Sequence, residues 1–366
     1  MKNSKIQSVE NISSALRSLY RSYGYLRFKM NKFEEYDFYV RNKDFLISDS
    51  VITFTDTNGK LMALKPDVTL SIVKNSRDVP GCVQKVYYNE HVYRVSGSAR
   101  SFREIVQLGL ECIGDIDDYC IYEVLSLAAQ SLWAVSSESV LNISHLGVFA
   151  EILDGVDTET RQAVMNCVRD KNIHELRRLC AAADLDECAE KIAALLQCYG
   201  SPDSVLPKVE EMLGEIPAIA QLKRLTAAFR GSEFESMLRI DFSVVNDINY
   251  YNGVLFKGFV EGVPQSVLSG GQYDKLMRKM GRNSGAIGFA VYTDLLEQLV
   301  PAKGGYDVDT VLLYDADADI QAVFGALNAL KVDSERAIAQ RSIPEKLRYR
   351  RLARLIDGEV VFIENA

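Results

Sequence analysis

The sequence predicts an α+β protein in which an antiparallel sheet is flanked by helices, with a helical insertion and a small α/β unit at its C-terminal end. Three observations support this fold class. Short β-rich runs separated by turn residues occupy residues 50–116, consecutive helical patterns occupy about 147–235, and β-rich runs return after them. Because strands stand on both sides of the helical stretch, an insertion inside one sheet domain is the simplest topology.

The N-terminal elements follow from hydrophobic periodicity. Residues 8–24 place apolar side chains at Ile12, Leu16, Leu19 and Tyr20, the spacing of an amphipathic helix, which is expected to run into a strand at YLRFKM. The run VITFTDTNGKLMALK contains an Asn-Gly pair between two β-rich segments, which predicts a hairpin. Further antiparallel strands are expected at VQKVYYNEHVYRV and REIVQLGLECIG.

Two domains are expected. The first spans residues 1–300 and contains the helical insertion at about 147–235, with strands returning in LRIDFSVV, YNGVLFKGFV and AIGFAVY. After Pro301 the segment AKGGYD is typical of a linker. Residues 301–366 then show a strand, a helix and a closing strand in VDTVLLYD, ADIQAVFGALNAL and GEVVFIEN, which predict a short α/β unit.

Composition limits the environment and the ligands. Hydrophobic residues make up 48% of the 366 residues and charged residues 25%, as in ordinary soluble globular proteins. No segment approaches the roughly 20 apolar residues of a membrane span, and the first twenty residues lack the apolar stretch of a signal peptide, so a cytoplasmic protein with no membrane partner is expected. The net charge of −8 weighs against a surface that grips RNA.

The cysteines and histidines do not suggest a metal. Seven cysteines are scattered without CxxC spacing, and only three histidines accompany them. Zinc sites and disulfide frameworks both need more regular spacing. We therefore expect reduced, mostly buried thiols, with no metal site and no cofactor.

The segment QLGLE at residues 107–111 is the first candidate site. Since side chains alternate along a strand, Gln107, Gly109 and Glu111 share one face, and the apolar side chains between them share the other. A glycine between two polar groups leaves room for something to approach the backbone, and a carboxylate beside an amide suits an ammonium group. A solvent-exposed polar strand face explains this segment equally well.

Three further segments are ambiguous when each is taken alone. ALKPDVT places Asp67 and Thr69 two residues apart on one side, although Pro-Asp turns are common. NYYNG sets Tyr250 and Tyr251 before a strand, and adjacent tyrosines usually mean one in the core and one outside. SGGQYD at residues 269–274 offers a glycine pair for a close turn.

The order and spacing of these segments are specific. ALKPDVT, then KVYYNE with REIVQLGLECIG, then NYYNGVLF, SGGQYDKL and GAIGFAVYTDLLEQL, resemble the catalytic domain of histidyl-tRNA synthetase, a class II aminoacyl-tRNA synthetase, over roughly residues 8–300. The resemblance implies a histidine site. In it, Asp67 and Thr69 hold the amino acid, Gln107 and Glu111 bind and orient its α-amino group, and two tyrosines line the imidazole pocket, namely Tyr250 and Tyr251.

The departures from the synthetase pattern fall on cations. By the resemblance, the motif 2 arginine that bridges the amino-acid carboxylate and the α-phosphate of ATP is matched by Tyr88. The arginine that assists adenylate formation is matched by Asn246, and the motif 3 arginine that clamps the γ-phosphate by Leu295. Phosphoryl chemistry of this kind depends on positioned positive charge, so loss of adenylation is expected. A shifted alignment that recruits Arg94, Arg100 or Arg103 would not restore all three.

A retained amino-acid site without these arginines is the pattern of the ATP phosphoribosyltransferase regulatory subunit family, and the chain is identified as a member of it. The details KPDVT and VYYNEHVYR are also similar to that family. The resemblance implies a role in histidine biosynthesis without catalysis. The resemblance also implies a hetero-oligomer with a short-form catalytic subunit of ATP phosphoribosyltransferase, and L-histidine as feedback inhibitor. A homodimer is implied through the class II dimer segment YGYLRFKMNKFEEYD. Binding of tRNA is not expected.

Other classes of function stay open. The first is an active histidyl-tRNA synthetase-like enzyme that activates an amino acid. The second is a class II paralogue that activates another amino acid for a different acceptor, and the third is a pure binding or sensor module with another partner.

Overall fold

The computed structural model describes residues 9–43, 46, 51–95, 101–245, 250–299, 306–331 and 336–365. These residues form two compact units, one over residues 9–299 and one over residues 306–365. Each unit is described separately. None of the described helices is long and apolar enough to cross a membrane.

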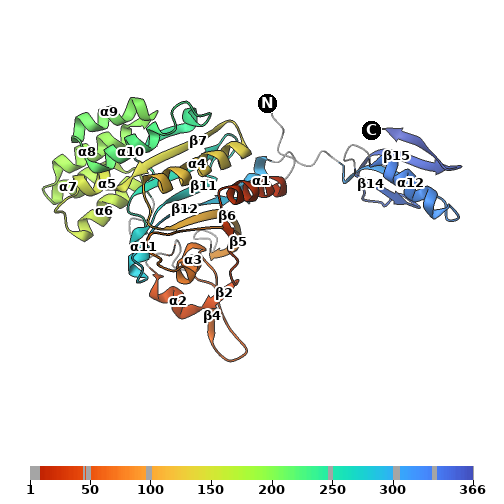
Figure 1. Cartoon of the computed structure of the whole chain (residues 1–366), viewed down its shortest axis with the longest axis horizontal. Helices are drawn as coiled ribbons and strands as arrows, with labels where there is room; N and C mark the ends of the chain where they lie inside the picture. The colour runs from red at the N-terminus through yellow and green to blue at the C-terminus, as the bar shows by residue number, and fades with distance from the viewer. Residues whose placement is uncertain are drawn as a thin grey trace. The chain divides into compact units, whose positions relative to one another are not determined.

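A nine-stranded sheet, counted over the described residues, forms the centre of the larger unit (Figure 1). Neighbouring strands are antiparallel except for the parallel pairs β1 with β5 and β7 with β9. The predicted α+β fold class with a mainly antiparallel sheet is therefore confirmed. In sheet order the strands are β1 (Leu26–Arg27), β5 (Val83–Val95), β6 (Phe102–Gly114), β12 (Gly285–Tyr292), β11 (Leu268–Gln272), β10 (Val254–Val260), β7 (Ser139–His145), β9 (Leu238–Asp241) and β8 (Tyr199–Gly200).

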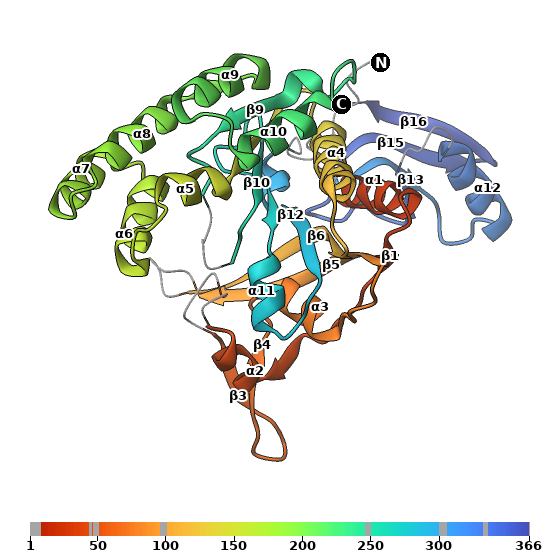
Figure 2. The ribbon, with the colours of Figure 1, turned by 60° about the vertical axis from the view of Figure 1, so that its left-hand side comes forward.

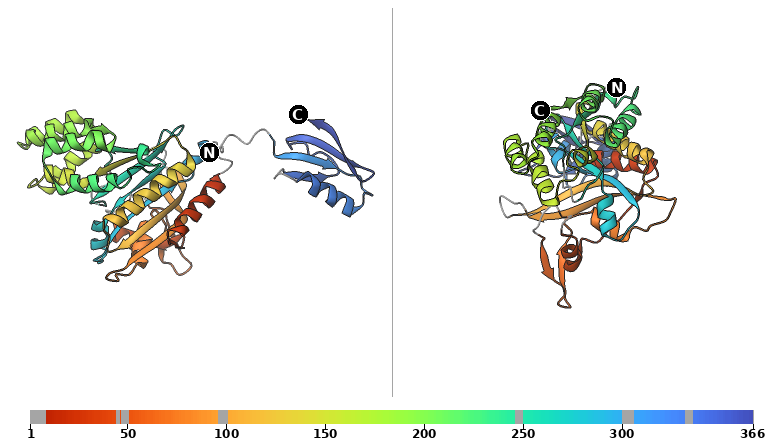
Figure 3. Two further views of the ribbon diagram at one scale, coloured as in Figure 1. Left: turned by 45° about the horizontal axis from the view of Figure 1, so that its top comes forward. Right: turned by 90° about the vertical axis from the view of Figure 1, so that its left-hand side faces the viewer.

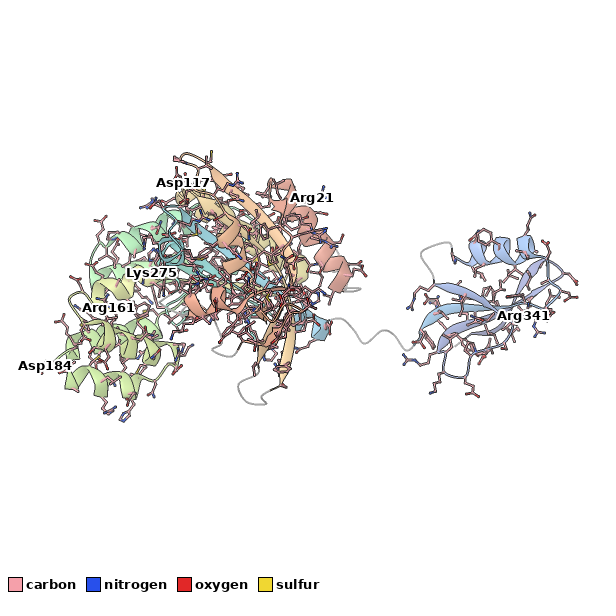
Figure 4. The ribbon with its side chains drawn as sticks, turned by 90° about the horizontal axis from the view of Figure 1, so that it is seen from below. Arg21, Asp117, Arg161, Asp184, Lys275 and Arg341 are labelled. Carbon is pink, nitrogen blue, oxygen red and sulfur yellow. The ribbon has the colours of Figure 1, made fainter. Side chains whose placement is uncertain are left out.

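Helices α1 (Val9–Ser22) and α4 (Asp118–Val135) lie side by side on one face of this sheet (Figure 3). The amphipathic pattern predicted α1, and Gly24 follows its end with φ +81°. Asp117, labelled in Figure 4, caps α4 by accepting a hydrogen bond from the Cys120 backbone N–H at 2.8 Å. The strand expected at YLRFKM is limited to Leu26–Arg27, because only these residues pair with β5.

The opposite face carries α3 (Thr69–Asn75) and α11 (Asp274–Lys279), visible below the sheet in Figure 2. A small three-stranded sheet adjoins α3, with β4 between β2 and β3, and α2 follows β2. The predicted Asn58-Gly59 turn joins β3 to β4, where Gly59 has φ +80° and the Asp56 carboxylate accepts the Asn58 backbone N–H at 2.8 Å. The bounds are β2 (Phe33–Glu35), α2 (Tyr36–Arg41), β3 (Thr53–Thr55) and β4 (Leu61–Leu64).

Helices interrupt the sheet between β7 and β9 (Figure 2). They lie at the end of the sheet that carries β8 and β9, where α9 contacts both strands and α10 contacts α4 and β7. The helices are α5 (Leu146–Ile152), α6 (Thr158–Arg169), α7 (Ile173–Ala182), α8 (Asp186–Gln197), α9 (Pro202–Leu213) and α10 (Pro217–Ala227), followed by the 3-10 turn η2 (Glu235–Met237).

The smaller unit is a four-stranded sheet with one described helix, in the strand order β14-β13-β15-β16. The predicted strand, helix and closing strand correspond to β13, α12 and β16. Two strands that hydrophobic pattern alone did not reveal, β14 and β15, pair in parallel with β13 on its two sides. The bounds are β13 (Val308–Leu313), α12 (Ile320–Leu330), β14 (Ala337–Gln340), β15 (Tyr349–Ile356) and β16 (Glu359–Asn365); the 3-10 turn η3 (Leu295–Leu299) ends the larger unit.

An ion pair to a buried carboxylate joins the helical face to the sheet. Lys85 Nζ on β5 lies 2.7 Å from the carboxylate of Glu123 on α4, whose side chain is 4% exposed. Tyr25, which follows α1, donates its hydroxyl to the same carboxylate at 3.2 Å. One carboxylate therefore connects α4, β5 and the chain after α1.

Replacing Lys85→Met should lower the free energy of unfolding by about 2 kcal/mol, because it leaves a buried carboxylate without its cation. The double variant Lys85→Met with Glu123→Leu should recover most of the loss. Urea denaturation measures both. As a control, Lys60→Met removes the partner of the exposed Glu35 and should leave the midpoint unchanged. Equal losses in the single and double variants would contradict the pairing.

Candidate functional site

A cavity of about 480 Å³ opens on the face of the sheet that carries α3 and α11. The structure brings all six residues of the expected amino-acid site together around it. They are Asp67, Thr69, Gln107, Glu111, Tyr250 and Tyr251. The remaining lining residues are Leu46, Tyr88, Arg94, Arg169, Val245, Lys257, Ser266, Ser269, Tyr273, Gly288, Phe289, Ala290 and Tyr292.

Strand β6 presents Gln107 and Glu111 to the cavity by its alternation. The two residues are 4% and 2% exposed, so the alternative of a solvent-exposed polar strand face is wrong. Gly109 between them has no space for a side chain, since a Cβ atom there would lie 2.5 Å from the Tyr88 hydroxyl. The room that this glycine leaves is therefore filled by the phenol of Tyr88.

The Glu111 carboxyl is held from two sides. Thr69 Oγ1, at the start of α3, donates to its Oε1 at 2.8 Å, and the Tyr273 hydroxyl donates to its Oε2 at 2.7 Å. A Cβ atom at Gly288 of the neighbouring strand β12 would overlap Oε2, so this position needs glycine. Burial raises the pKa of Glu111 to about 8; the two hydrogen bonds act in the opposite direction, and the charge of Asp67 adds to the rise.

Asp67 supplies a second buried carboxyl. Its Oδ1 accepts the Leu70 backbone N–H at 2.9 Å in the first turn of α3. Thr69 is therefore presented by the start of a helix and not by strand alternation, although both residues reach the same cavity. Burial raises the pKa of Asp67, and the nearby guanidinium of Arg94 opposes that rise.

Tyrosine rings form the apolar wall of the cavity. The ring centroids of Tyr250 and Tyr251 are 4.6 Å apart, and those of Tyr250 and Tyr273 are 5.7 Å apart. The expectation that one of the adjacent tyrosines points into the core and the other outward is wrong, because both line the cavity. Burial raises the pKa of all three phenols well above the ordinary value, so they act as neutral groups.

The glycine pair of SGGQYD does not form the close turn that was expected. Gly270 and Gly271 lie inside β11, paired with β10 on one side and β12 on the other. A Cβ atom at Gly271 would lie 2.8 Å from the Tyr251 ring and 2.5 Å from the Leu255 side chain. These glycines therefore permit the tyrosine wall to pack against the sheet.

The positions matched to the synthetase arginines have different surroundings. Tyr88 is 2% exposed and lines the cavity. Leu295 begins η3 and lines a separate cavity, of about 490 Å³, which shares Ser266 and Tyr292 with the first. Asn246 lies outside the described residues.

Sequence reasoning missed several lining residues. Tyr273 lies within the SGGQYD segment, but nothing local indicated that its hydroxyl would bond Glu111. Arg94 was noted only as a neighbour of Tyr88 along the chain. Lys257 and Arg169 also line the cavity, and burial lowers the pKa of Lys257. The cavity thus contains cations at positions other than those matched to the synthetase arginines.

The loop before Asp67 is fastened to β5. The Tyr93 backbone N–H donates to the Lys65 carbonyl at 2.9 Å, and Arg94 Nε donates to the Pro66 carbonyl at 3.1 Å. The fully buried Lys65 ammonium also lies 2.9 Å from the Glu90 carboxylate. These contacts set the position of Asp67 relative to the end of β5.

No group of three or more described His, Cys, Asp or Glu side chains has the geometry to hold a metal ion. What the cavity offers is two buried carboxyl groups, neutral phenols and cations at its edges. Carboxyl groups in such a setting favour a positively charged or N–H-bearing ligand, since its charge would offset their cost of burial.

The mainly antiparallel sheet, with α1 and α4 on one face and this polar cavity on the other, is the class II aminoacyl-tRNA-synthetase-like fold. The family model for histidyl-tRNA synthetase matches residues 1–296, and the chain belongs to that family.

Curated relatives carry a more particular name. The chain is 25% identical over 299 residues to an ATP phosphoribosyltransferase regulatory subunit of Oceanobacillus iheyensis, covering 79% of this chain and 73% of the relative. It is 24% identical over 345 residues to a protein of the same name from Clostridium acetobutylicum, covering 89% of this chain and 84% of the relative. The recognition of this family from the sequence motifs is thus confirmed.

Solved structures share the fold. An ATP phosphoribosyltransferase regulatory subunit/histidyl-tRNA synthetase from Bacillus halodurans has a TM-score of 0.75 at 22% identity, covering 93% of this chain and 92% of that one. Histidyl-tRNA synthetase from Nostoc sp. has a TM-score of 0.76 at 16% identity, covering 97% of this chain and 93% of that one. A chain of the ATP phosphoribosyl transferase (HisG:HisZ) complex from Thermotoga maritima has a TM-score of 0.62 at 20% identity, covering 77% of this chain and 96% of that one.

Stability should depend on pH through Glu111. The folded protein holds a proton on this carboxyl up to about pH 8, whereas the unfolded chain releases it near the ordinary pKa of about 4.3. Between these values the folded state binds more protons, so the free energy of unfolding falls as pH rises. Glu111→Gln should remove this part of the slope.

Thermal unfolding midpoints from about pH 5 to about pH 9 measure the effect. The wild type should lose more stability across this range than Glu111→Gln. The control Glu211→Gln changes an exposed glutamate on α9 and should run parallel to the wild type. Parallel curves for Glu111→Gln and wild type would show that Glu111 is ionised in the folded protein.

Proposed function

We propose that this chain is a non-catalytic regulatory subunit of ATP phosphoribosyltransferase that binds L-histidine in the cavity. One observation carries the proposal. The six residues matched to the histidine site line one cavity, while two positions matched to phosphate-binding arginines hold Tyr88 and Leu295.

The charges and shape of the cavity support an amino-acid ligand. The α-ammonium group is a cation, and Asp67 and Glu111 are the buried carboxyls beside which it would bind. An amide at Gln107 adds a hydrogen-bonding group on the same strand. The rings of Tyr250 and Tyr251, tilted by 47° to each other, offer an aromatic wall for an imidazole ring.

The same charges are a poor match for the activation of an amino acid by ATP. Transfer from a triphosphate depends on positioned cations at the phosphates, and removal of one such arginine costs several powers of ten in rate in related systems. Tyr88 is a buried, neutral phenol where the bridging arginine would stand. Leu295 carries no charge at the motif 3 position. We therefore assign binding without adenylation to this chain.

The partner follows from the names of the relatives. They are called regulatory subunits, and a structural neighbour comes from a complex named as HisG:HisZ. In our proposal the chain assembles with a short-form catalytic subunit, which lacks its own regulatory domain, and histidine limits the first step of its own biosynthesis. The strength of this regulation is the coupling free energy between histidine binding to this chain and the catalytic subunit, typically about 1 to 3 kcal/mol.

We also propose a homodimer through the class II segment at residues 23–37. This segment leaves Leu26 and Phe33 exposed at 72% and 48%, and apolar side chains of this kind favour association. Light scattering on the purified chain should give about twice the mass of one chain. The mass of a single chain would refute the dimer.

Calorimetric titration of the full chain with L-histidine tests the ligand. We expect saturable binding by the wild type and a loss of affinity of roughly 10-fold or more in Glu111→Gln, because the variant removes a charge-assisted hydrogen bond. The control Glu104→Gln should bind as the wild type does. Saturable binding that Glu111→Gln leaves unchanged would place the histidine site elsewhere.

Assays of the reconstituted complex with the catalytic subunit test the regulation. The ratio of phosphoribosyltransferase activity without histidine to that with histidine should exceed one for the wild type and approach one for Glu111→Gln. Histidine-dependent pyrophosphate exchange by the chain alone tests the alternative. Exchange at rates typical of synthetases would establish an amino-acid-activating enzyme in which Arg94, Arg169 or Lys257 replaces the missing arginines.

A further inference from the structure

The proposed function leaves one group of the ligand without a binding partner. An α-amino acid carries a carboxylate next to its ammonium group, and the arginine expected to bind that carboxylate is replaced by Tyr88. A buried carboxylate needs a cation or several donors, since leaving it unpaired costs several kcal/mol. The cavity must therefore provide a cation close to the ammonium subsite if it binds an amino acid.

Arg94 is placed for this role. It lies near the end of β5, its side chain lines the cavity, and it is half-buried. Its Nε–H donates to the Pro66 carbonyl at 3.1 Å, which holds the guanidinium next to the backbone of the residue that precedes Asp67. The positive charge of Arg94 also acts on Asp67, Tyr251 and Tyr292.

Arg94 has no ion-pair partner among the described residues, although its charge acts on Asp67 from a longer distance. Among the described residues, no carboxylate lies within ion-pairing distance of its guanidinium, whereas the exposed Arg177 and Arg178 each pair with a glutamate. A half-buried guanidinium that faces a cavity without a carboxylate partner is available to an anionic group.

The other two cations of the cavity are less suitable. Arg169 bonds Asp170 at 3.0 Å, and its side chain is 53% exposed. Lys257 lies on β10, which is separated from β6 by β11 and β12, and Asp241 is the carboxylate that acts on its charge. Arg94 is hydrogen-bonded to Pro66, the residue before Asp67. The ammonium and carboxylate groups of an α-amino acid are attached to the same carbon, so the residues that bind them must also lie close together.

We propose that Arg94 binds the carboxylate of the amino-acid ligand, replacing the cation that is missing at Tyr88. This inference rests on the proposed function and names the residue that makes the cavity specific for an amino acid over its decarboxylated amine. Arg94 donates from its two Nη groups to the ligand carboxylate while its Nε–H stays on Pro66. The residue recognises the ligand and takes part in no chemical step.

Calorimetric titrations of the full chain with L-histidine and with histamine, which lacks the carboxylate, test the proposal. The wild type should bind histidine more tightly than histamine. Arg94→Gln should weaken histidine binding by roughly 10- to 100-fold, as expected for hydrogen bonds to a charged group, and leave histamine binding unchanged. The ratio of the two affinities should therefore approach one.

A matched control is available across the strand pair. Arg103 on β6 is the cross-strand partner of Arg94 but does not line this cavity, so Arg103→Gln should keep the wild-type ratio. If Arg94→Gln fails to fold, Arg94→Lys carries the test, because it keeps the charge but loses the planar fork; a smaller loss of histidine affinity is then expected.

The outcomes separate this inference from the proposed function. Equal weakening of both ligands by Arg94→Gln would show a structural role only, and unchanged affinities for both ligands would place the carboxylate elsewhere; either result overturns the inference while histidine binding stands. A wild type that binds no histidine would overturn the proposed function and this inference together.

Discussion

The arrangement of the larger unit around its cavity depends on one buried carboxyl group, that of Glu111. Its two oxygens accept hydroxyl hydrogen bonds from Thr69 and Tyr273, which belong to the start of α3 and to the segment before α11. A third element, β12, approaches so closely that only glycine fits at position 288. A buried carboxyl without these donors would be costly, so Glu111 positions the elements around the cavity that it lines.

In the proposed function, the residues that recognise the amino acid belong to the sheet and to the start of α3, so recognition is separable from phosphate chemistry. Glu111 and Gln107 lie on β6 and Asp67 precedes α3, whereas the positions matched to the phosphate-binding arginines lie on β5, before β10 and after β12. With Tyr88 and Leu295 at two of those positions, both hydrogen bonds of Glu111 are present. A class II scaffold that keeps the first set and lacks the second is thus a physically consistent binding protein, since binding needs ground-state complementarity only.

Local rules in the sequence predicted the features that local physics decides. The Asn58-Gly59 turn and the alternation of Gln107 and Glu111 depend on one segment each, and both occur as expected. Whether that strand face is buried depends on α3 and β12, which are distant in sequence. Glycines serve close turns and close strand packing alike, and only the pairing of β11 with its two neighbours shows that Gly270 and Gly271 serve the second.

The site was predictable to the extent that residue type and motif order specify it. The resemblance to histidyl-tRNA synthetase, which rests on the order of the motifs, grouped six residues into one site, namely Asp67, Thr69, Gln107, Glu111, Tyr250 and Tyr251. Tyr273 and Arg94 could not be assigned roles in this way. One acts through a hydroxyl that reaches across the sheet to Glu111, and the other lies near the cavity because the Pro66 carbonyl holds it there. Both placements are consequences of tertiary packing.

The charge state of Glu111 gives occupancy of the cavity a physical route to the rest of the protein. Burial raises its pKa to about 8, so a proton neutralises the carboxyl at neutral pH. A ligand ammonium group favours the ionised carboxylate and would displace that proton. The hydrogen bonds from Thr69 and Tyr273 then become charge-assisted, and such bonds are shorter and roughly twice as strong as neutral ones. In the proposed function, binding would tighten α3 and α11 onto the sheet through these two hydrogen bonds, and a partner that contacts either helix would respond to the ligand. This difference in free energy between the empty and occupied states is what a regulatory subunit needs.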